Sequence, residues 1–381
     1  MKIVYCTDSI CHPGGIQMVT IAKANALAKI PSNEVYIVVT DNKSKPLKLL
    51  GGVHVIDLGV NYYADDWRGF IYVLKGIFLK RRLHKRLLRE KLNEIKPDVV
   101  ISTGTSEKYF LPTLRVCSHP RFVREIHSYT GYRHVHATTL RDKLMSYIGD
   151  WYDYKWKIKA YDRIVVLTNE DRKKNWRDNA KVVVMPNPIT TECGRLSNIE
   201  AKKAISMGRL VHVKNFSSLI RIWSEVAKKH SDWRLEIYGS GEQETMLQLL
   251  IKSLGLEDKV IMMGYTSEAL ERMADASMYC LSSITEGFPL VLVEAMSVGL
   301  PVVSYACPTG PSDIIVDEDN GYLIPVGNEK MFADRICTLI EDKERRIRLG
   351  HKAKEMSEAY SVDVICTKWM RLFEELRKGK R

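Results

Sequence analysis

Short apolar runs rich in Val and Ile alternate along the chain with longer segments of helical spacing. The expected strands are Ile3–Cys6, Val35–Thr40, Val53–Leu58, Val99–Ser102, Phe122–Ile126 and Ile164–Leu167 in the first half, and Leu235–Tyr238, Val260–Met263, Met278–Leu281, Val302–Tyr305 and Gly321–Ile324 in the second. Helical segments such as Gly15–Lys29 and Ile77–Ile95 lie between strands. Apolar strands separated by helices are typical of parallel sheets covered on both faces. The pattern predicts an α/β protein with two doubly wound, Rossmann-like units in tandem.

A break in this pattern divides the chain at Met185-Pro186-Asn187-Pro188-Ile189. Two prolines in three positions interrupt a strand or a helix and favour an extended connection. We therefore expect a first domain over residues 1–189 and a second over residues 190–361. Residues 362–381 form a last segment, in which the apolar side chains of Val362–Lys378 recur at amphipathic helical spacing.

The charge is unevenly distributed between the two halves. The 381 residues include 58 Lys and Arg against 46 Asp and Glu, a formal net charge of +12. Residues 1–189 hold 32 basic and 18 acidic side chains, whereas the rest of the chain holds 26 and 28. With 45% apolar residues, the composition excludes disordered and collagen-like proteins. The basic half indicates an anionic partner, and composition leaves both nucleic acid and an acidic membrane surface open.

Cysteine usage and the N-terminus favour a cytoplasmic protein. None of the eight cysteines forms a Cys-x-x-Cys pair, and several lie in apolar runs, which favours reduced, buried thiols. The first residues enter a strand pattern without the apolar core of a signal peptide. The longest apolar window, Phe70–Leu79, is well short of the ~20 residues that span a bilayer.

Paired glycines follow the first expected strand. Pro13-Gly14-Gly15 precedes a helical segment, and glycines at such a position allow phosphate or sugar oxygens to approach the backbone and the helix N-terminus. An ordinary strand-to-helix turn explains Gly14 and Gly15 equally well.

Two cations stand five positions apart near the start of the second half. Arg209, within Gly208-Arg209-Leu210, and Lys214 lie at an expected strand-to-helix junction. Converging there, they would offset the charge of a diphosphate without a metal. Solvated surface charge is the alternative explanation.

The richest motif is Thr285-Glu286-Gly287-Phe288-Pro289-Leu290-Val291-Leu292-Val293-Glu294. It begins as a turn after a strand and continues as a helix, so Glu286 lies in the loop and Glu294 about one turn inside the helix. Backbone amides of the Gly287–Leu290 region would line an anion site at the helix N-terminus, although Pro289 has no N–H. Both carboxylates can then accept hydrogen bonds from sugar hydroxyls. A helix with favourably placed acidic residues is the plainer alternative.

Taken in order, these motifs resemble those of the retaining glycosyltransferases of family four, of bacterial surface-polysaccharide type. The ordered set is Gly14-Gly15, Pro186-Asn187-Pro188, Gly208-Arg209-Leu210 with Lys214, and Glu286-Gly287-Phe288-Pro289 with Glu294. The resemblance covers nearly the whole chain. It implies the GT-B fold, in which two Rossmann-like domains face a central cleft and the C-terminal helix returns to the first domain.

The resemblance also implies roles for individual residues. Arg209 and Lys214 would hold the donor diphosphate, Glu294 the donor ribose, and Glu286 the reacting face of the donor sugar. Amides around Phe288 and Leu290 would contact sugar and phosphate. His127, just after a strand, matches a family histidine near donor and acceptor, whereas a lone histidine there is more often structural. No cofactor or metal is expected, because Asp317-Glu318-Asp319 fits a solvated acidic turn.

Two basic regions of the first half suggest how the acceptor is reached. The segment Leu74–Lys96 carries nine Lys or Arg around an apolar stripe suited to the core or to a membrane interface, and Trp151–Lys159 interleaves aromatic and basic residues. The predicted acceptor or membrane face is formed by Lys80, Arg81, Arg82, Lys85, Arg86, Arg89, Trp151 and Trp156. Nucleic acid is the competing partner, but no helix-turn-helix, zinc-finger or RNP pattern is present.

Together with the charged motifs, the resemblance therefore implies a metal-independent hexosyltransferase that uses a nucleotide sugar, UDP-linked, and retains the anomeric configuration. The acceptor is expected to be a glycan or a polyprenyl-diphosphate-linked glycan, reached from the inner face of the cell membrane. Two alternatives stay open: a nucleotide-sugar epimerase or hydrolase of the same fold, and a noncatalytic membrane-associated carbohydrate- or nucleotide-binding protein.

Overall fold

The structure is a computed structural model, and it describes residues 1–11, 14–41, 49, 51–62, 70–130, 139–177, 179–191 and 193–379. Side chains of residues 70–77 also lie outside this description, as does Pro13 of the predicted glycine loop. The chain divides into two compact units. Unit 1 comprises Met1–Leu167, Asp171–Thr190 and Val362–Arg381, and unit 2 comprises Thr168–Glu170 and Thr191–Ser361.

Unit 1 is built on a seven-stranded sheet in the order β3-β2-β1-β4-β5-β6-β7. Its strands are β1 (Lys2–Thr7), β2 (Glu34–Val39), β3 (Val53–Asp57), β4 (Val99–Ser102), β5 (Arg121–Glu125), β6 (Arg163–Val166) and β7 (Val182–Val184), and neighbours pair in parallel. Its helices are α1 (Gly15–Ala28), α2 (Phe70–Ile95), η1 (Leu111–Thr113), α4 (Leu140–Asp150), η2 (Trp151–Trp156), η3 (Lys157–Ala160), η4 (Arg172–Trp176) and α13 (Val362–Lys378). The short α5 (Asn169–Asp171) lies where the chain passes between units.

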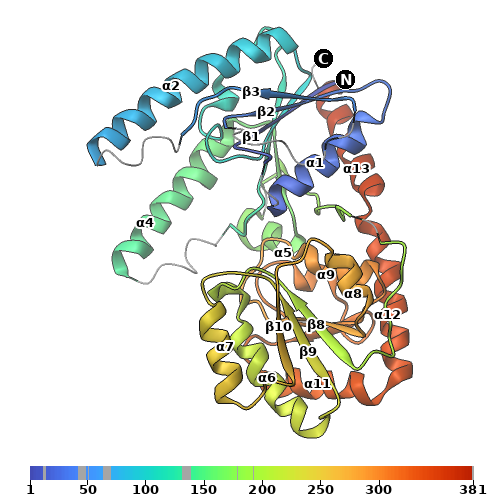
Figure 1. The fold of residues 1–381 in the computed structure, drawn as a ribbon. Coiled ribbons are helices and arrows are strands. Elements are labelled where there is room, and N and C mark those ends of the chain that lie inside the picture. Colours follow the sequence, from blue (N-terminus) through green and yellow to red (C-terminus); the bar gives the residue numbers. More distant parts are fainter. Residues whose placement is uncertain are drawn as a thin grey trace. The chain divides into compact units, whose positions relative to one another are not determined.

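The last helix, α13, belongs to the core of unit 1. Ile365, Trp369 and Phe373 are fully buried, in one cluster with β1 and α1 residues such as Tyr5 and Leu27. Figure 1 shows α13 in red beside the blue α1. Arg121 on β5 extends this packing, because its guanidinium donates to the carbonyl oxygen of Leu376 at 3.2 Å.

Unit 2 is built on a six-stranded sheet in the order β10-β9-β8-β11-β12-β13. Its strands are β8 (Lys203–Met207), β9 (Arg234–Tyr238), β10 (Val260–Gly264), β11 (Met278–Leu281), β12 (Val302–Tyr305) and β13 (Gly321–Ile324), again paired in parallel. Its helices are η5 (His212–Lys214), α6 (Phe216–Lys229), α7 (Glu244–Ser253), α8 (Ala269–Ala274), α9 (Leu290–Ser297), α10 (Pro311–Ile314), α11 (Glu329–Glu341), α12 (Lys343–Ser357) and η6 (Glu358–Tyr360).

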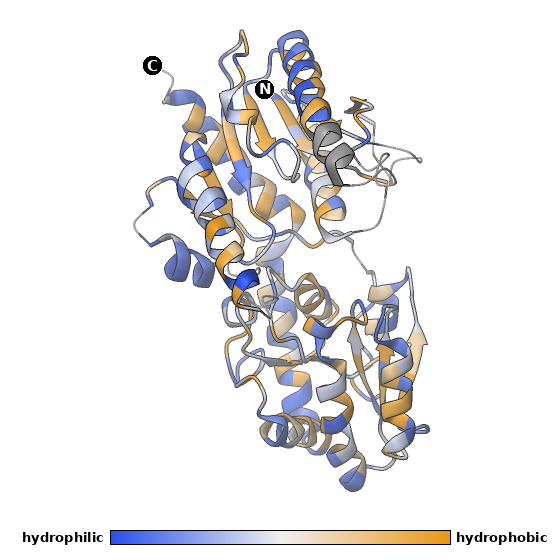
Figure 2. Ribbon diagram, turned by 90° about the vertical axis from the view of Figure 1, so that its left-hand side faces the viewer, coloured by the Kyte–Doolittle hydropathy of each residue, from blue (hydrophilic) through white to orange (hydrophobic). Residues whose placement is uncertain are grey.

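In each unit, the hydropathy of the residues explains why the strands are covered and why each helix has one face toward the sheet. In Figure 2 the strands are mostly orange, whereas the helices carry orange on one side and blue on the other. Strands β4, β11 and β12 are buried along their whole length, as expected of parallel strands covered on both faces. In unit 2, Trp223 of α6 and Phe332 of α11 are buried in a cluster against the sheet.

The predicted doubly wound architecture is confirmed, and the eleven expected strands correspond to observed ones. Two observed strands lie outside these eleven ranges, although the expected strand-to-helix junction at Gly208–Lys214 implies a strand where β8 is found. Val182–Val184 (β7) is only three residues long and lies next to the proline break, and Lys203–Met207 (β8) contains Lys, Ala and Ser, which have weak strand preference. Tertiary pairing to β9 and β11 makes β8 a central strand regardless.

Candidate active site

The strand order of unit 2 creates a switch point between β8 and β11. From β8 the chain winds outward through β9 and β10, and it then returns to place β11 on the other side of β8. Ligands of open parallel sheets bind outside the carboxyl ends of the strands at such a point. The two segments that leave these carboxyl ends are Gly208–Lys214 and Ser282–Pro289, which hold most of the predicted donor residues.

Lys214 and Glu286 form an ion pair across this switch point. The Lys214 ammonium lies 2.6 Å from Oε1 of Glu286, and the Ser283 hydroxyl donates to the same oxygen at 2.6 Å. The two side chains are 19% and 10% exposed. An ammonium has three N–H donors, so pairing with one oxygen leaves Lys214 able to bind a further anion. The sequence identified both charges but neither their contact nor Ser283.

Backbone hydrogen bonds fix both partners. The Ser282 hydroxyl donates to the carbonyl oxygen of Lys214 at 2.9 Å, and the Ile284 N–H donates to that of Val213 at 2.9 Å. The Glu286 N–H donates to the carbonyl oxygen of Pro308 at 2.8 Å. Such preorganisation holds an anion site in place before ligand binds.

Glycines of the next loop support the Gly208–Leu210 segment. A Cβ on Gly239 would lie 1.9 Å from the carbonyl oxygen of Gly208, and a Cβ on Gly241 would lie 2.5 Å from that of Leu210. Gly239 also has φ +146°, which side-chain-bearing residues rarely adopt. Two backbone bonds join the loops, including the Leu210 N–H to the carbonyl oxygen of Ser240 at 2.9 Å. The sequence did not predict the role of these glycines, because they form no motif with Arg209.

The segment Gly287–Leu290 enters α9, whose N-cap is Pro289. The Leu290 N–H donates to the carbonyl oxygen of Phe288 at 2.9 Å, so it is already used. Within the described residues, the N–H groups of Gly287 and Phe288 have no hydrogen-bond acceptor. The buried Phe288 ring packs 5.8 Å from that of Tyr360. The amides closest to the loop, rather than that of Leu290, are therefore the donors available to a ligand.

Glu294 lies in α9, where part of the residue is exposed but the carboxyl group is largely surrounded by protein. This burial raises the pKa of the carboxyl to about 7, and no cation among the described residues counteracts the effect. A buried carboxylate without a cation is costly unless it is hydrogen-bonded. The hydroxyl groups of a ligand could supply these hydrogen bonds.

Arg209 differs from its predicted partner. Its side chain is exposed and forms no ion pair among the described residues, whereas Lys214 is held by Glu286. Arg209 therefore keeps its planar donors available for an anion at the carboxyl end of β8.

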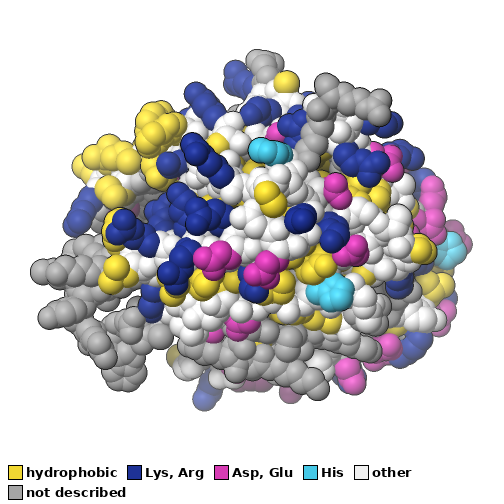
Figure 3. Space-filling model, turned by 90° about the horizontal axis from the view of Figure 1, so that it is seen from above, with side chains coloured by type: hydrophobic (Ala, Val, Ile, Leu, Met, Phe, Trp, Pro, Cys, Tyr) yellow, Lys and Arg dark blue, Asp and Glu magenta, His cyan; other side chains and the backbone are white. Residues whose placement is uncertain are grey.

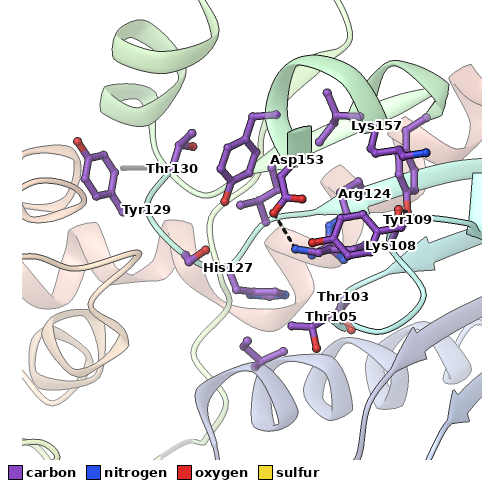
Figure 4. Close-up of a pocket in the computed structure, with 16 residues that line it drawn as sticks. Thr103, Thr105, Lys108, Tyr109, Arg124, His127, Tyr129, Thr130, Asp153 and Lys157 are labelled. Carbon is purple, nitrogen blue, oxygen red and sulfur yellow. Dashed lines mark hydrogen bonds and ion pairs between the residues drawn. The ribbon is translucent and has the colours of Figure 1, made fainter. Parts of the chain in front are cut away.

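Unit 1 has its own cavity, of about 350 Å³. Figure 4 shows the side chains around it, which come from the start of α1, from β5, from the segments after β4 and β5, from η2 and η3, and from the residue after η3. They are Ile16, Thr103, Thr105, Lys108, Tyr109, Arg124, Ile126, His127, Ser128, Tyr129, Thr130, Asp153, Tyr154, Lys157, Ile158 and Tyr161. His127, which the sequence placed at a ligand site, thus lines a cavity at the carboxyl ends of parallel strands.

A buried charge cluster lies behind His127. Its Nε2 is 3.5 Å from Oε1 of Glu125, the last residue of β5, and the same oxygen accepts from the Lys23 ammonium. Burial by itself would raise the pKa of Glu125, but Lys23 and His127 outweigh it and lower the pKa to about 2. The Lys23 ammonium also lies 4.7 Å from the Trp369 ring centroid, so α13 closes the cluster.

Gly14 and Gly15 lie at the start of α1 in unit 1. Gly14 is the N-cap in extended conformation, and its carbonyl oxygen accepts from the Met18 N–H at 3.0 Å. A Cβ on Gly14 would meet the Gln17 side chain at 2.4 Å, a flexible group that can move. Gly14 and Gly15 therefore lie at a helix N-terminus, which is compatible with both interpretations of the sequence.

The apolar stripe of α2 serves the core. Leu88, Leu92 and Ile95 are buried beneath the unit 1 sheet, which resolves the choice that the sequence left open for this half of the helix. Of the six predicted basic residues, Lys80 donates to the carbonyl oxygen of Asn61 at 2.6 Å. Arg81 lies 5.3 Å from the Tyr109 ring and Arg82 lies 5.4 Å from that of Phe78, while Lys85, Arg86 and Arg89 are exposed.

Figure 3 shows the face that is seen from above Figure 1. Many Lys and Arg side chains lie on this face, and hydrophobic side chains protrude at one edge of it. Trp151 and Trp156 are both exposed, and their ring centroids are 6.0 Å apart. Helix α4 was not predicted from the sequence. It precedes Trp151 and exposes further apolar side chains.

The described residues contain no group of three or more His, Cys, Asp or Glu side chains placed to hold a metal ion. In the acidic turn, Asp317 accepts from the Leu323 N–H at 2.9 Å and Glu318 pairs with Arg335 at 2.9 Å, so both acids serve the turn. No helix in the described part of the chain has the length and apolarity to cross a bilayer.

Comparison with known proteins identifies the family. Residues 195–356 match the family described as Glycosyl transferases group 1. A relative from Haemophilus influenzae, named an uncharacterized glycosyltransferase, is 31% identical over 375 residues, covering 97% of this chain and 98% of the relative. The N-acetylgalactosamine-N,N'-diacetylbacillosaminyl-diphospho-undecaprenol 4-alpha-N-acetylgalactosaminyltransferase of Campylobacter jejuni is 32% identical over 162 residues, 42% of this chain and 44% of that protein.

A solved structure shares the fold over the full length. S. aureus TarM, in complex with Fondaparinux, alpha-GlcNAc-glycerol and UDP, superposes with a TM-score of 0.73 at 17% identity, covering 98% of this chain and 99% of that one. The chain has the GT-B fold, with one Rossmann-like sheet in each unit. On the strength of the full-length relative and the family match, the chain belongs to the group 1 glycosyltransferases, enzymes that transfer sugars.

Proposed function

We propose that this enzyme transfers a hexosyl unit from a UDP-linked sugar, with retention of configuration and without a metal, as in glycosyltransferase family four. The acceptor is a glycan or a polyprenyl-diphosphate-linked glycan in surface-polysaccharide assembly. Unit 2 binds the donor and unit 1 the acceptor. No resident cofactor takes part, because the nucleotide sugar is itself a substrate.

One observation carries the proposal: the Lys214–Glu286 pair at the switch point of unit 2. The ammonium is fixed at 2.6 Å from its partner and retains donors for a second anion. Exposed Arg209 stands on the same loop, and the Gly287 and Phe288 amides stand on the loop of Glu286. Two cations and two backbone amides are suited to a diphosphate. Glu294, in the helix that follows this loop, has carboxylate oxygens that can accept hydrogen bonds from ribose hydroxyls.

The same residues suggest how the bond is exchanged. As the bond between the anomeric carbon and the diphosphate oxygen breaks, negative charge grows on that oxygen, where Arg209, Lys214 and the loop amides stabilise it. The acceptor hydroxyl attacks the same face of the sugar and passes its proton to the departing phosphate. Glu286, held by Lys214 and Ser283, orients the sugar hydroxyls.

The relatives support the substrate classes. The TarM structure contains UDP, and the Campylobacter jejuni relative is named for an acceptor linked to diphospho-undecaprenol. The first half of this chain carries the excess of basic residues, which suits an acceptor presented at an acidic membrane surface. We place the enzyme on the inner face of the cell membrane.

A panel of nucleotide sugars tested against soluble and lipid-linked acceptors examines this proposal. A UDP-sugar should be consumed only when an acceptor is present, and the anomeric configuration of the product should match the donor. Donor consumption without acceptor would indicate an epimerase or a hydrolase, and nucleotide affinity without turnover would indicate a binding protein. A requirement for a divalent ion, seen as loss of activity in chelator, would contradict the metal-independent mechanism.

A further inference from the structure

Helix α4 exposes a continuous apolar stripe in unit 1. Leu140, Leu144, Ile148 and Trp151 are spaced so that they lie along one side of the helix, and they are 51–86% exposed. Met145 and Tyr147 beside them are exposed as well. Elsewhere in the described chain, exposed large apolar side chains stand singly or in pairs, as is usual on protein surfaces. A stripe of this kind marks a binding surface.

The residues around the stripe favour a lipid surface as its partner. By helical spacing, Arg141 and Lys143 border the stripe on its two sides, while Asp142 lies on the opposite face, where it closes a capping box with Thr139. The helix has 11 residues and cannot span a bilayer, but it can lie in the interface with its apolar side down.

The segment after α4 continues this surface. Trp151, Lys155, Trp156 and Lys159 are exposed, and the Lys157 ammonium lies 4.6 Å from the Trp156 ring centroid. Tryptophan and lysine together are typical of the headgroup level of a membrane. The basic flanks fit acidic headgroups, which attract each nearby Lys or Arg.

This segment also forms one wall of the unit 1 cavity. Asp153, Tyr154, Lys157 and Ile158 line the cavity, although they alternate with the exposed residues of the same turns. Asp153 is buried and accepts from the Lys108 ammonium at 2.9 Å. Figure 4 shows this bond on one side of the cavity. A molecule bound in the cavity would therefore lie against η2 and η3, the segment that directly follows α4 and its apolar stripe.

The cavity has an excess of positive charge. Its lining includes Lys108, Arg124 and Lys157 against the single carboxylate of Asp153. Behind the lining, Glu107 lies 3.9 Å from the Arg124 guanidinium, and burial raises the pKa of this carboxyl to about 7, which weakens its negative charge. The Arg124 guanidinium donates to the carbonyl oxygen of Gly104 and the Ser102 hydroxyl, both at 2.7 Å, which fixes its position at the cavity wall. Lysine and arginine held in this way are suited to phosphate oxygens. The volume of about 350 Å³ is within the range of small-molecule sites.

We infer that α4 and residues 151–159 dock on an acidic lipid leaflet, and that the cavity behind them binds the phosphate group of an acceptor whose lipid is anchored in that leaflet. The inference rests on the proposed lipid-linked acceptor and assigns it a site. It also extends the predicted membrane face, which already included Trp151 and Trp156, to α4, whereas Leu88, Leu92 and Ile95 of α2 lie in the core.

Vesicle cosedimentation tests the docking surface. Wild-type protein should bind phosphatidylcholine vesicles that contain phosphatidylglycerol, and bind pure phosphatidylcholine more weakly. The double substitution Leu144→Ser and Ile148→Ser should lower partitioning at least ~10-fold, because two large side chains no longer enter the apolar layer. Leu249→Ser is the matched control: Leu249 on α7 is 64% exposed, against 61% for Leu144, and its loss should change nothing.

Several outcomes would overturn the inference: no binding of wild-type protein to acidic vesicles, equal binding of the double variant, or a wild-type dimer that the double variant turns into a monomer without any vesicle binding. Circular dichroism confirms that the variants fold. UDP titration of the same samples keeps the two claims apart, since failure to bind UDP contradicts the proposed donor site, whereas failure to bind vesicles contradicts only this inference.

Undecaprenyl diphosphate added to the vesicles tests the cavity. Wild-type protein should bind the doped vesicles several-fold more tightly than undoped ones. Arg124→Gln should lose this increment while it keeps its binding to phosphatidylglycerol, because Arg124 lines the cavity and lies outside the docking segment. The absence of an increment in the wild type, or an increment that Arg124→Gln retains in full, would contradict the phosphate site.

Discussion

Two lysine–glutamate pairs at the carboxyl ends of parallel strands show how the same charges serve different purposes. In unit 1, Lys23 and Glu125 are each 1% exposed, and α13 covers them with Trp369. In unit 2, Lys214 and Glu286 are 19% and 10% exposed, at the edge where β8 and β11 diverge. Protein atoms enclose the first pair, which is almost inaccessible to solvent. The second retains donors that a ligand can use.

The difference lies in what surrounds each pair. The Lys23 ammonium lies between the Tyr5 and Trp369 rings, 5.6 Å and 4.7 Å from their centroids, so its charge is compensated without solvent. Among the described residues, Glu286 is instead the one side chain that pairs with Lys214, and backbone bonds fix the loops around the pair. Burial thus predicts that loss of the first pair affects folding and loss of the second affects catalysis.

The largest effect is expected from Lys23→Met, which leaves Glu125 charged in the core. Removal of one partner of a buried pair costs about 3–5 kcal/mol, and we expect a loss of this size in the free energy of unfolding of unit 1. Chemical denaturation measures it. Lys23→Met combined with Glu125→Gln should recover part of the loss, because no uncompensated charge remains. A single variant as stable as wild type would show that the pair is not sealed.

Lys214→Ala should instead lower turnover by about 10²–10³-fold with little change in melting temperature, because a cation that stabilises the leaving diphosphate is lost. Lys203→Ala is the matched control. Lys203 pairs with Glu236 at 3.3 Å with exposed fractions of 14% and 6%, but it lies at the amino end of β8, away from the switch point. Initial rates with saturating donor separate the two. Equal losses in both variants would contradict a specific role for Lys214.

A smaller, pH-dependent effect is expected at Glu294. Its pKa is raised to about 7 by burial, so the unliganded carboxyl is largely protonated at pH 6 and ionised at pH 8. Ribose hydroxyls donate best to the ionised form, and UDP affinity should therefore rise with pH by up to about 10-fold per unit below the pKa. Titration of wild type and Glu294→Gln isolates this dependence from that of the phosphate. Parallel pH profiles in the two proteins would exclude Glu294 from the ribose site.

The same ionisation predicts a stability effect of the opposite sign. Between pH 4.5 and 7 the folded protein retains a proton on Glu294 that the unfolded chain has lost, so stability falls as pH rises, by at most about 1.4 kcal/mol per unit. Glu294→Gln should remove this slope in denaturation experiments without ligand. A wild-type slope that persists in the variant would have to come from another group.

The smallest effect is expected at an exposed pair. Arg221 and Glu329 approach to 2.7 Å on α6 and α11, but both are substantially exposed. Surface pairs contribute about 0–1 kcal/mol, and Arg221→Ala should therefore change the unfolding free energy by no more than this. A loss comparable with that of Lys23→Met would mean that burial does not rank these pairs.

Much of the fold was predictable because hydrophobic periodicity marks parallel strands clearly. The eleven expected strands were found, but the range of β8 was not predicted, because its pairing partners, rather than its residues, determine it. For the site, residue types pointed to Lys214 and Glu286, but their contact depends on the adjacency of β8 and β11, which a linear pattern does not reveal. The burial of Lys23 was equally hidden, since it follows from the return of α13.

The α4 surface illustrates the opposite case. The apolar spacing of α4 can be recognised in the sequence Leu140–Trp151. The same spacing in α2, however, is that of a core helix. Periodicity shows that a face is apolar, and only the fold shows whether protein covers it. Exposure of Leu144 and Ile148 is therefore information that the structure adds.

The most direct test of the central claim, a donor diphosphate site at the switch point of unit 2, is calorimetric titration of UDP into wild type, Lys214→Ala and Lys203→Ala. We expect wild type and Lys203→Ala to bind UDP with the same affinity, and Lys214→Ala to bind at least ~10-fold more weakly at an unchanged melting temperature. Equal affinity for UDP in all three proteins would contradict it.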